Sequence, residues 1–170
     1  MRTSVVAGAL IAVLFALPSL QSQATSAKRE SQTVVFVCEH GTVKSVVAAK
    51  YFNRVARQRH LPIRAVSRGT NLESIVPRVV HEGLARDGFD LRSFKPTAVD
   101  KAELQAALLV VTFDRPDVAS IIGSGVPVVA WDNFPAVSAN YNIARDSIRL
   151  RVAHLVDSLA HVPIVGRHPH

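Results

Sequence analysis

The chain has 170 residues, which suits one domain with a hydrophobic core and is short for two. Hydrophobic residues make up 48% of the sequence and aromatic residues only 6%, so we expect an aliphatic core. The formal net charge of +7 favours anionic partners such as phosphate esters, although the same charge also fits a solvated basic surface. Because no basic patch is interleaved with aromatic residues, nucleic acid is not expected as a partner.

The N-terminal segment has the features of an export signal. Arg2 is followed by an apolar run over residues 5–17, and small residues that suit signal cleavage lead up to Ala24. The apolar run is shorter than the roughly 20 residues that a membrane-spanning helix needs. We therefore predict a signal peptide over residues 1–24 and an exported domain, periplasmic or secreted, over residues 25–170. We expect no stable membrane insertion after cleavage, and an uncleaved N-terminal membrane anchor is the alternative.

The first strand and helix of the domain are joined by a short loop that contains glycine. Residues 33–37 form an unbroken apolar, β-branched run, which is typical of a strand covered on both faces in a parallel sheet. Residues 46–59 alternate apolar and polar side chains at helical spacing. In this geometry the backbone N–H groups at the start of the helix point toward an anion.

Strands and helices continue to alternate through the rest of the chain. Pro77 falls in the first turn of the second predicted helix, where proline is tolerated, and Gly88 follows the end of that helix. The alternation, with short links and no internal repeat, predicts an α/β fold: a three-layer sandwich with an open, four-stranded parallel sheet flanked by helices. The further strands are predicted over residues 63–66, 107–113 and 126–130, and the further helices over residues 75–86, 98–104, 117–122 and 139–159.

Cys38, Asp114 and Asp132 each follow the end of a predicted strand, at the edge where open parallel sheets bind ligands. Cys38 is the only cysteine, whereas exported proteins usually carry cysteines in disulfide pairs. A lone cysteine can be a small buried hydrophobe. The position of Cys38 beside a helix start, which favours the thiolate form, predicts a nucleophile instead.

Several short motifs stand in a fixed order along residues 33–160. Val-Phe-Val-Cys38 is followed six positions on by the basic residue Lys44 and then by Ser45. The other motifs are Ser67-Arg68-Gly69-Thr70, Gly88-Phe89-Asp90-Leu91, Lys95-Pro96, and Trp131-Asp132 with Pro135. Together these motifs resemble the low-molecular-weight protein tyrosine phosphatase family and its arsenate reductase relatives.

The resemblance implies a phosphomonoester hydrolase that works through a cysteinyl-phosphate intermediate. In this reading Cys38 is the nucleophile, Lys44 is the cation that holds the phosphoryl oxygens, and Ser45 is the hydroxyl that assists the thiolate. The resemblance implies no cofactor and no metal, and the substrate would be a phosphorylated protein or a small aryl phosphate. Phosphate binding is assigned to the loop residues Glu39, His40, Gly41, Thr42, Val43 and Lys44.

The loop departs from the family pattern at several positions. Family members carry arginine where this chain has Lys44, and an ammonium group grips phosphate oxygens with less fixed geometry than a guanidinium. They commonly carry asparagine where this chain has Gly41. Glu39 places a negative charge beside the anion site, which a protonated His40 would partly offset.

The general acid is predicted to come from the loop that follows the fourth strand. In the tyrosine phosphatases it is an aspartate directly before a proline, whereas here Asp132 and Pro135 are separated. Asp132 is the preferred candidate, as the only carboxylate between that strand and the last helix. Asp114 is the alternative, although a helix-capping role fits it as well. Arg68 could replace the missing guanidinium or be a surface arginine.

Three functions therefore remain open from the sequence. The first is the phosphomonoester hydrolase. The second is an arsenate reductase, which would begin with the same thiolate attack and would need an external thiol because the chain has no second cysteine. The third is a catalytically weak module that binds an oxyanion or a phosphoprotein.

Overall fold

The computed structural model describes residues 32–114, 118–123 and 125–161. The predicted signal peptide lies outside these ranges. Within them, no helix is both long enough and apolar enough to cross a bilayer. The elements are β1 (Gln32–Cys38), α1 (Lys44–Gln58), β2 (Ile63–Gly69), α2 (Arg78–Arg86), α3 (Lys101–Ala106), β3 (Leu109–Phe113), α4 (Ala119–Ile122), β4 (Val128–Trp131) and α5 (Tyr141–Ala160).

The four strands form one parallel sheet, as predicted, and the structure places them in the order β2-β1-β3-β4. The register places Cys38 opposite Gly69, and Phe113 opposite Trp131. The unbroken apolar run of β1 is buried from Val34 to Cys38, which agrees with a central strand covered on both faces. Because all four strands run the same way, the segments that follow them gather at one edge of the sheet.

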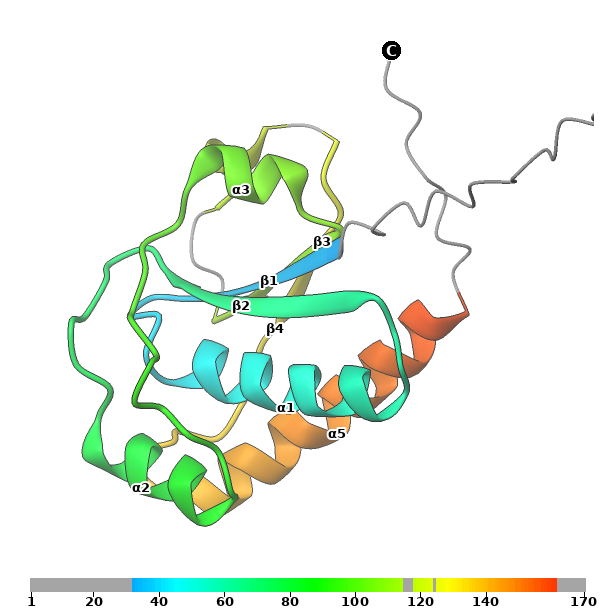
Figure 1. The fold of residues 1–170 in the computed structure, drawn as a ribbon. Coiled ribbons are helices and arrows are strands. Elements are labelled where there is room, and N and C mark those ends of the chain that lie inside the picture. The colour runs from blue at the N-terminus through cyan, green and yellow to red at the C-terminus, as the bar shows by residue number, and fades with distance from the viewer. Residues whose placement is uncertain (1–31, 115–117, 124, 162–170) are drawn as a thin grey trace, which may run out of the picture.

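Helices cover both faces of the sheet, so the predicted three-layer sandwich is confirmed (Figure 1). Val34 and Phe36 of β1 pack into the larger core cluster with α1 and α5. Val35 and Val37 point to the opposite face, where they pack against residues of α3 and α4. Alternate residues of β1 thus serve both layers.

Several predicted boundaries differ from the structure by two or three residues, among them the start of α2 and the end of β2. α2 begins at Arg78 because Pro77 is its N-cap residue, with extended backbone angles, and not part of its first turn. Proline also disfavours a helical conformation in the residue before it, so the helix cannot extend back to residue 75. β2 runs on to Gly69 because it pairs with the full length of β1.

Contacts with α5 fix the position of α2. Tyr141 Oη donates a hydrogen bond to Asp87 Oδ2 at 2.7 Å, and Arg145 Nη1 donates to Asp87 Oδ1 at 2.9 Å. A Cβ atom at Gly83 would come within 2.4 Å of the Tyr141 ring, so only glycine allows this close approach. α2 is therefore held firmly, and its first turn forms one wall of the pocket described below.

Candidate active site

The candidate catalytic loop, residues 38–44, leads from the last residue of β1 to the first residue of α1 and is called the catalytic loop below. The carbonyl groups of Cys38, Glu39 and His40 accept hydrogen bonds from backbone N–H groups of the segment 70–73. By contrast, the backbone N–H groups of residues 39–45 find no acceptor among the described residues. The first turn of α1 contains no acidic residue. These N–H groups are therefore available to an oxyanion, in the way that helix starts commonly bind one.

Two glycines hold the catalytic loop against the end of β2. Gly41 has φ +70°, and a Cβ atom there would come within 2.8 Å of the backbone nitrogen of Gly69. A Cβ atom at Gly69 would come equally close, 2.8 Å, to the nitrogen of Gly41. The backbones thus touch directly. The asparagine common in the family at this position tolerates a positive φ, but this close contact leaves no room for a side chain.

Replacing Gly41 with alanine is expected to lower the free energy of unfolding and to disrupt the loop. The positive φ alone costs roughly 1 kcal/mol for a residue with a Cβ atom, and the contact with Gly69 adds to that cost. Gly123→Ala is the matched control, because Gly123 has φ +71° with no atom within 4 Å of the added Cβ. Urea denaturation should show a clearly larger loss for Gly41→Ala. Equal losses would contradict the steric role of the contact.

The Cys38 thiol heads a chain of hydroxyl groups. Cys38 Sγ lies 3.0 Å from Ser45 Oγ, and Ser45 Oγ lies 2.9 Å from Ser67 Oγ. Ser67 Oγ donates to the carbonyl oxygen of Gly41 at 2.8 Å, which directs the proton of Ser67 toward the loop. Ser45 can then donate to either neighbour, including a thiolate at Cys38. All three side chains are buried, so this chain of contacts is shielded from solvent.

Ser67 belongs to this arrangement although we assigned it no role from the sequence. Its position gave a usable signal, because it is a polar residue on the inward-facing side of β2, where Ile63 and Ala65 are apolar. A buried hydroxyl at the carboxyl end of a parallel strand needs a partner, and here that partner is the catalytic loop.

Lys44 forms an ion pair with Asp114 at the mouth of the site. Lys44 Nζ donates to Asp114 Oδ2 at 2.5 Å, and the Lys44 side chain is 15% exposed against 54% for Asp114. Asp114 has φ +56°, a left-handed conformation that is uncommon outside glycine and that aspartate tolerates better than most residues. The turn directly after β3 thus brings a carboxylate to the cation of the loop.

A pocket of about 290 Å³ opens in front of Cys38. The loop supplies Glu39, His40, Val43 and Lys44 to its lining, and Asp114 lies opposite them. The remaining walls are mostly aliphatic and come from the start of α2 and the loop after β4: Pro77, Val79, Val80, Ala136, Val137 and Ser138.

The structure brings some of the predicted site residues together and leaves others outside the pocket. Gly41 and Thr42 are buried and do not line the pocket. Asp132 is partly buried and does not line the pocket. Trp131 packs in the core against Phe36 and Phe113 and is not at the pocket mouth.

Arg68 points away from the catalytic loop's anion site. Its guanidinium group forms a bidentate ion pair with the carboxylate of Glu103 in α3, and it also donates to the carbonyl oxygen of Ser67. Arg68 therefore does not supply the guanidinium that the loop lacks.

In the described ranges, no cluster of His, Cys, Asp and Glu side chains is suited to hold a metal.

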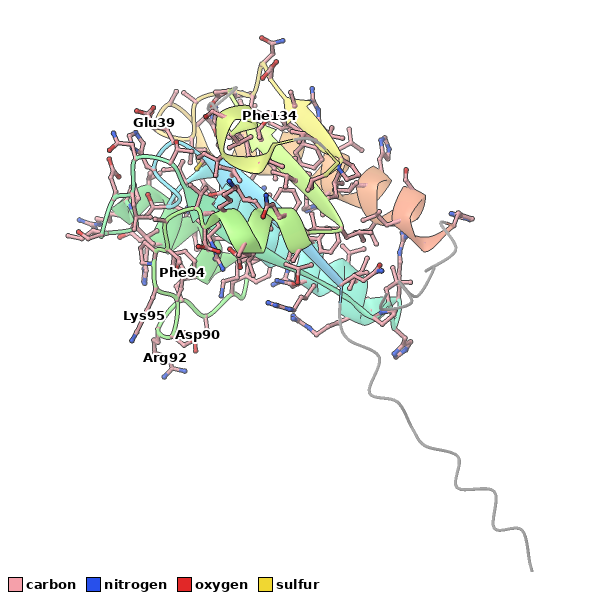
Figure 2. The ribbon with its side chains drawn as sticks, turned by 90° about the horizontal axis from the view of Figure 1, so that it is seen from above. Glu39, Asp90, Arg92, Phe94, Lys95 and Phe134 are labelled. Carbon is pink, nitrogen blue, oxygen red and sulfur yellow. The ribbon has the colours of Figure 1, made fainter. Side chains whose placement is uncertain are left out.

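His40 lies between two carboxylates at the rim of the pocket. Its Nε2 is 3.8 Å from Glu39 Oε2 and its Nδ1 is 3.5 Å from Glu73 Oε1. Both carboxylates are well exposed, and Glu39 lies at the outer edge of the loop (Figure 2). The rim thus carries two carboxylates on the side of His40.

The comparisons with known proteins agree with this geometry. A family model described as low molecular weight phosphotyrosine protein phosphatase matches residues 33–126, more than half of the chain. The chain is also similar to the structure of an arsenate reductase from Archaeoglobus fulgidus, with 30% identity and a TM-score of 0.58, covering 73% of this chain and 98% of that one. No curated protein matches it in sequence.

Two further structures share the fold at lower identity. A thioredoxin-dependent arsenate reductase from Corynebacterium glutamicum is 18% identical with a TM-score of 0.65, and the match covers 78% of this chain but only 64% of that one. The YwlE arginine phosphatase of Bacillus subtilis, in a mutant with a phosphorylated active-site serine, is 18% identical with a TM-score of 0.67, covering 76% and 97%. The predicted family and fold are confirmed. The chain belongs to the low molecular weight phosphotyrosine protein phosphatase family.

Proposed function

We propose that this protein hydrolyses phosphomonoesters through a cysteinyl-phosphate intermediate on Cys38. The observation that carries the proposal is the position of the Cys38 thiol. It lies at the carboxyl end of β1, 3.0 Å from the Ser45 hydroxyl, in a pocket floored by unpaired N–H groups at the start of α1. A thiolate there faces the phosphorus of any phosphoryl group that these N–H groups bind.

The reaction would proceed in two displacements. The Cys38 thiolate attacks phosphorus, the bond from phosphorus to the ester oxygen breaks, and a carboxylic acid gives that oxygen a proton. Water then attacks the phosphocysteine, the same carboxylate takes a proton from the water, and orthophosphate leaves with the thiolate restored. Lys44 and the loop N–H groups would hold the three non-bridging oxygens during both steps.

Asp114 is the carboxyl group that best fits this acid–base role, with Asp132 as the alternative. Asp114 lines the pocket and contacts Lys44, whereas Asp132 follows β4 outside the lining. A bound phosphoryl group brings its own negative charge to Lys44. We propose that the bound phosphoryl group replaces Asp114 as the ion-pair partner of the Lys44 ammonium group. The Asp114 carboxyl group can then carry a proton.

The pocket walls favour an aryl or other apolar leaving group. Val43, Pro77, Val79 and Val137 place aliphatic surface around the approach to Cys38. A phosphotyrosine side chain or a small aryl phosphate would bury its ring against this surface.

The apolar segment before residue 25 supports export, so we propose substrates outside the cytoplasm.

Hydrolysis of p-nitrophenyl phosphate by the purified protein tests the proposal. We expect saturable release of p-nitrophenol and competitive inhibition by orthophosphate, because product and substrate share the loop. If the protein binds orthophosphate but releases no p-nitrophenol or phosphate from any aryl ester, the function is that of an oxyanion-binding module and the proposal is wrong.

Arsenate reduction is a second candidate, favoured by the 30% identity to the Archaeoglobus arsenate reductase. Cys38 would bond to arsenic with loss of water, and two external thiol groups would then supply two electrons, forming a disulfide and releasing arsenite and the Cys38 thiol. Cys38 is the only cysteine of the chain, so the reductant must come from another molecule. Arsenite formation that depends on added thioredoxin or glutathione, in the absence of aryl phosphatase activity, would favour this function.

A further inference from the structure

A second cavity, of about 550 Å³, lies between α1, the end of β2 and the loop 88–95. It shares no lining residue with the catalytic pocket. Figure 2 shows Asp90, Arg92, Phe94 and Lys95 on its outer loop, well apart from Glu39 of the catalytic loop. A pocket of this size is in the range of small-molecule sites, which is roughly 300–1,000 Å³.

Cations dominate the lining of this cavity, which we call the basic groove. Lys50, Arg54 and Arg57 all lie on α1, four and three residues apart, so they share one face of the helix. Lys95 reaches the groove from the loop on the other side. The groove therefore presents positive charge from two walls.

Little negative charge balances these cations. Asp90 is the only carboxylate in the groove lining, and it already forms a bidentate ion pair with Arg92. Lys50 Nζ donates to the carbonyl oxygen of Asp90 at 2.8 Å, and Arg54 Nη2 donates to the carbonyl oxygen of Asp87 at 2.8 Å. These backbone carbonyls orient the cations but do not neutralise them.

The other groove cations are equally uncompensated. Arg57 and Lys95 form no ion pair within the part of the chain that the structure describes, and both are exposed. The fifth cation of the lining, Arg68, is neutralised by Glu103. Burial, opposed by Asp90 and reinforced by Arg57, lowers the pKa of Lys50.

We propose that the basic groove binds a small polyanion that carries at least two phosphate or carboxylate groups. A single negative charge would leave most of the four uncompensated cations unbalanced. Lys50 and Arg57 are separated by about 10 Å along the helix axis, at 1.5 Å per residue, and their long side chains can converge from this separation on one ligand. A short phosphate chain, a nucleoside diphosphate or a tricarboxylate carries several anionic groups for such a cluster of cations.

Calorimetric titration of the full chain with tripolyphosphate, ADP and citrate tests the proposal. We expect saturable binding that weakens as salt is added, with Arg57→Ala and Lys95→Ala each raising the dissociation constant by about tenfold. Both side chains are exposed, so circular dichroism should show folded variants. The ligand that binds most tightly identifies its class as inorganic phosphate chain, nucleotide or carboxylate.

Two control variants locate the binding. Arg149→Ala removes the same charge from an exposed position on α5 outside the groove, and Lys44→Ala removes the cation of the catalytic pocket. Both should leave the dissociation constant within about twofold of the parent value. The proposal is overturned if no ligand binds, if Lys44→Ala abolishes binding that the groove variants retain, or if Arg149→Ala weakens binding as much as Arg57→Ala does.

Discussion

Replacing Cys38 with serine is expected to lower phosphomonoester turnover by on the order of 10⁴-fold or more, because a serine hydroxyl is not ionised near neutral pH. The substitution exchanges one small side chain for another at a buried position that already contacts Ser45. The loop should therefore keep its shape, and the free energy of unfolding should change by about 1 kcal/mol or less. Hydrolysis of p-nitrophenyl phosphate and urea denaturation measure the two quantities.

Measuring orthophosphate binding by Cys38→Ser distinguishes the loss of the nucleophile from the loss of the folded loop. The anion is held by Lys44 and by loop N–H groups, neither of which the substitution removes, so its affinity should stay within roughly tenfold of the parent value. Turnover that survives in Cys38→Ser would show that another group attacks phosphorus. Loss of both turnover and orthophosphate binding would instead mean that the thiol is needed to form the loop.

The fold could be predicted from the sequence because local patterns of apolar and polar residues indicate its strands and helices. β1 from Val34 onward and the whole of β3 are continuously buried, and four strand segments separated by helical segments leave few alternatives to a parallel sheet. The position of Cys38 followed from the same pattern, since the end of β1 and the start of α1 define the loop. Helix boundaries near Pro77 were less well predicted, because a proline fits either the cap or the first turn.

Contacts between distant segments could not be predicted in this way. The pairing of Lys44 with Asp114 and of Arg68 with Glu103 depends on side-chain directions at the sheet edge, which sequence order does not determine. The direct backbone contact between Gly41 and Gly69 likewise joins the catalytic loop to the end of β2, and their distance is set by the register of β1 and β2. Sequence patterns placed these residues at the correct edge, and three-dimensional packing decided their partners.

Replacing Asp114 with asparagine is expected to slow the hydrolysis of esters with poor leaving groups by roughly 10²–10⁴-fold, the range for loss of a general acid. An ester with a good leaving group, such as p-nitrophenyl phosphate, needs less protonation and should lose much less. The ratio of turnover for p-nitrophenyl phosphate to that for phenyl phosphate is therefore the diagnostic measurement. It should rise sharply in Asp114→Asn.

Asp132→Asn is the matched control, since it makes the same chemical change in the turn after β4, outside the pocket lining. We expect it to leave the leaving-group ratio unchanged. A rise in the ratio for Asp132→Asn alone would assign the acid to Asp132. Equal losses for both esters in Asp114→Asn would show that Asp114 acts on the loop's structure and not on the leaving oxygen.

The ion pair with Lys44 gives Asp114→Asn a second expected effect, of opposite sign. In the parent protein the Asp114 carboxylate and a bound oxyanion compete for the same ammonium group, because Lys44 Nζ lies 2.5 Å from Asp114 Oδ2. An amide at this position competes less strongly, so orthophosphate should inhibit the variant at several-fold lower concentration, as expected for a partly exposed pair worth about 1 kcal/mol. Slower turnover together with tighter orthophosphate binding would show that Asp114 both competes for the Lys44 ammonium group and protonates the leaving group. If Asp114 only stabilises the loop, Asp114→Asn should slow turnover and also weaken orthophosphate binding.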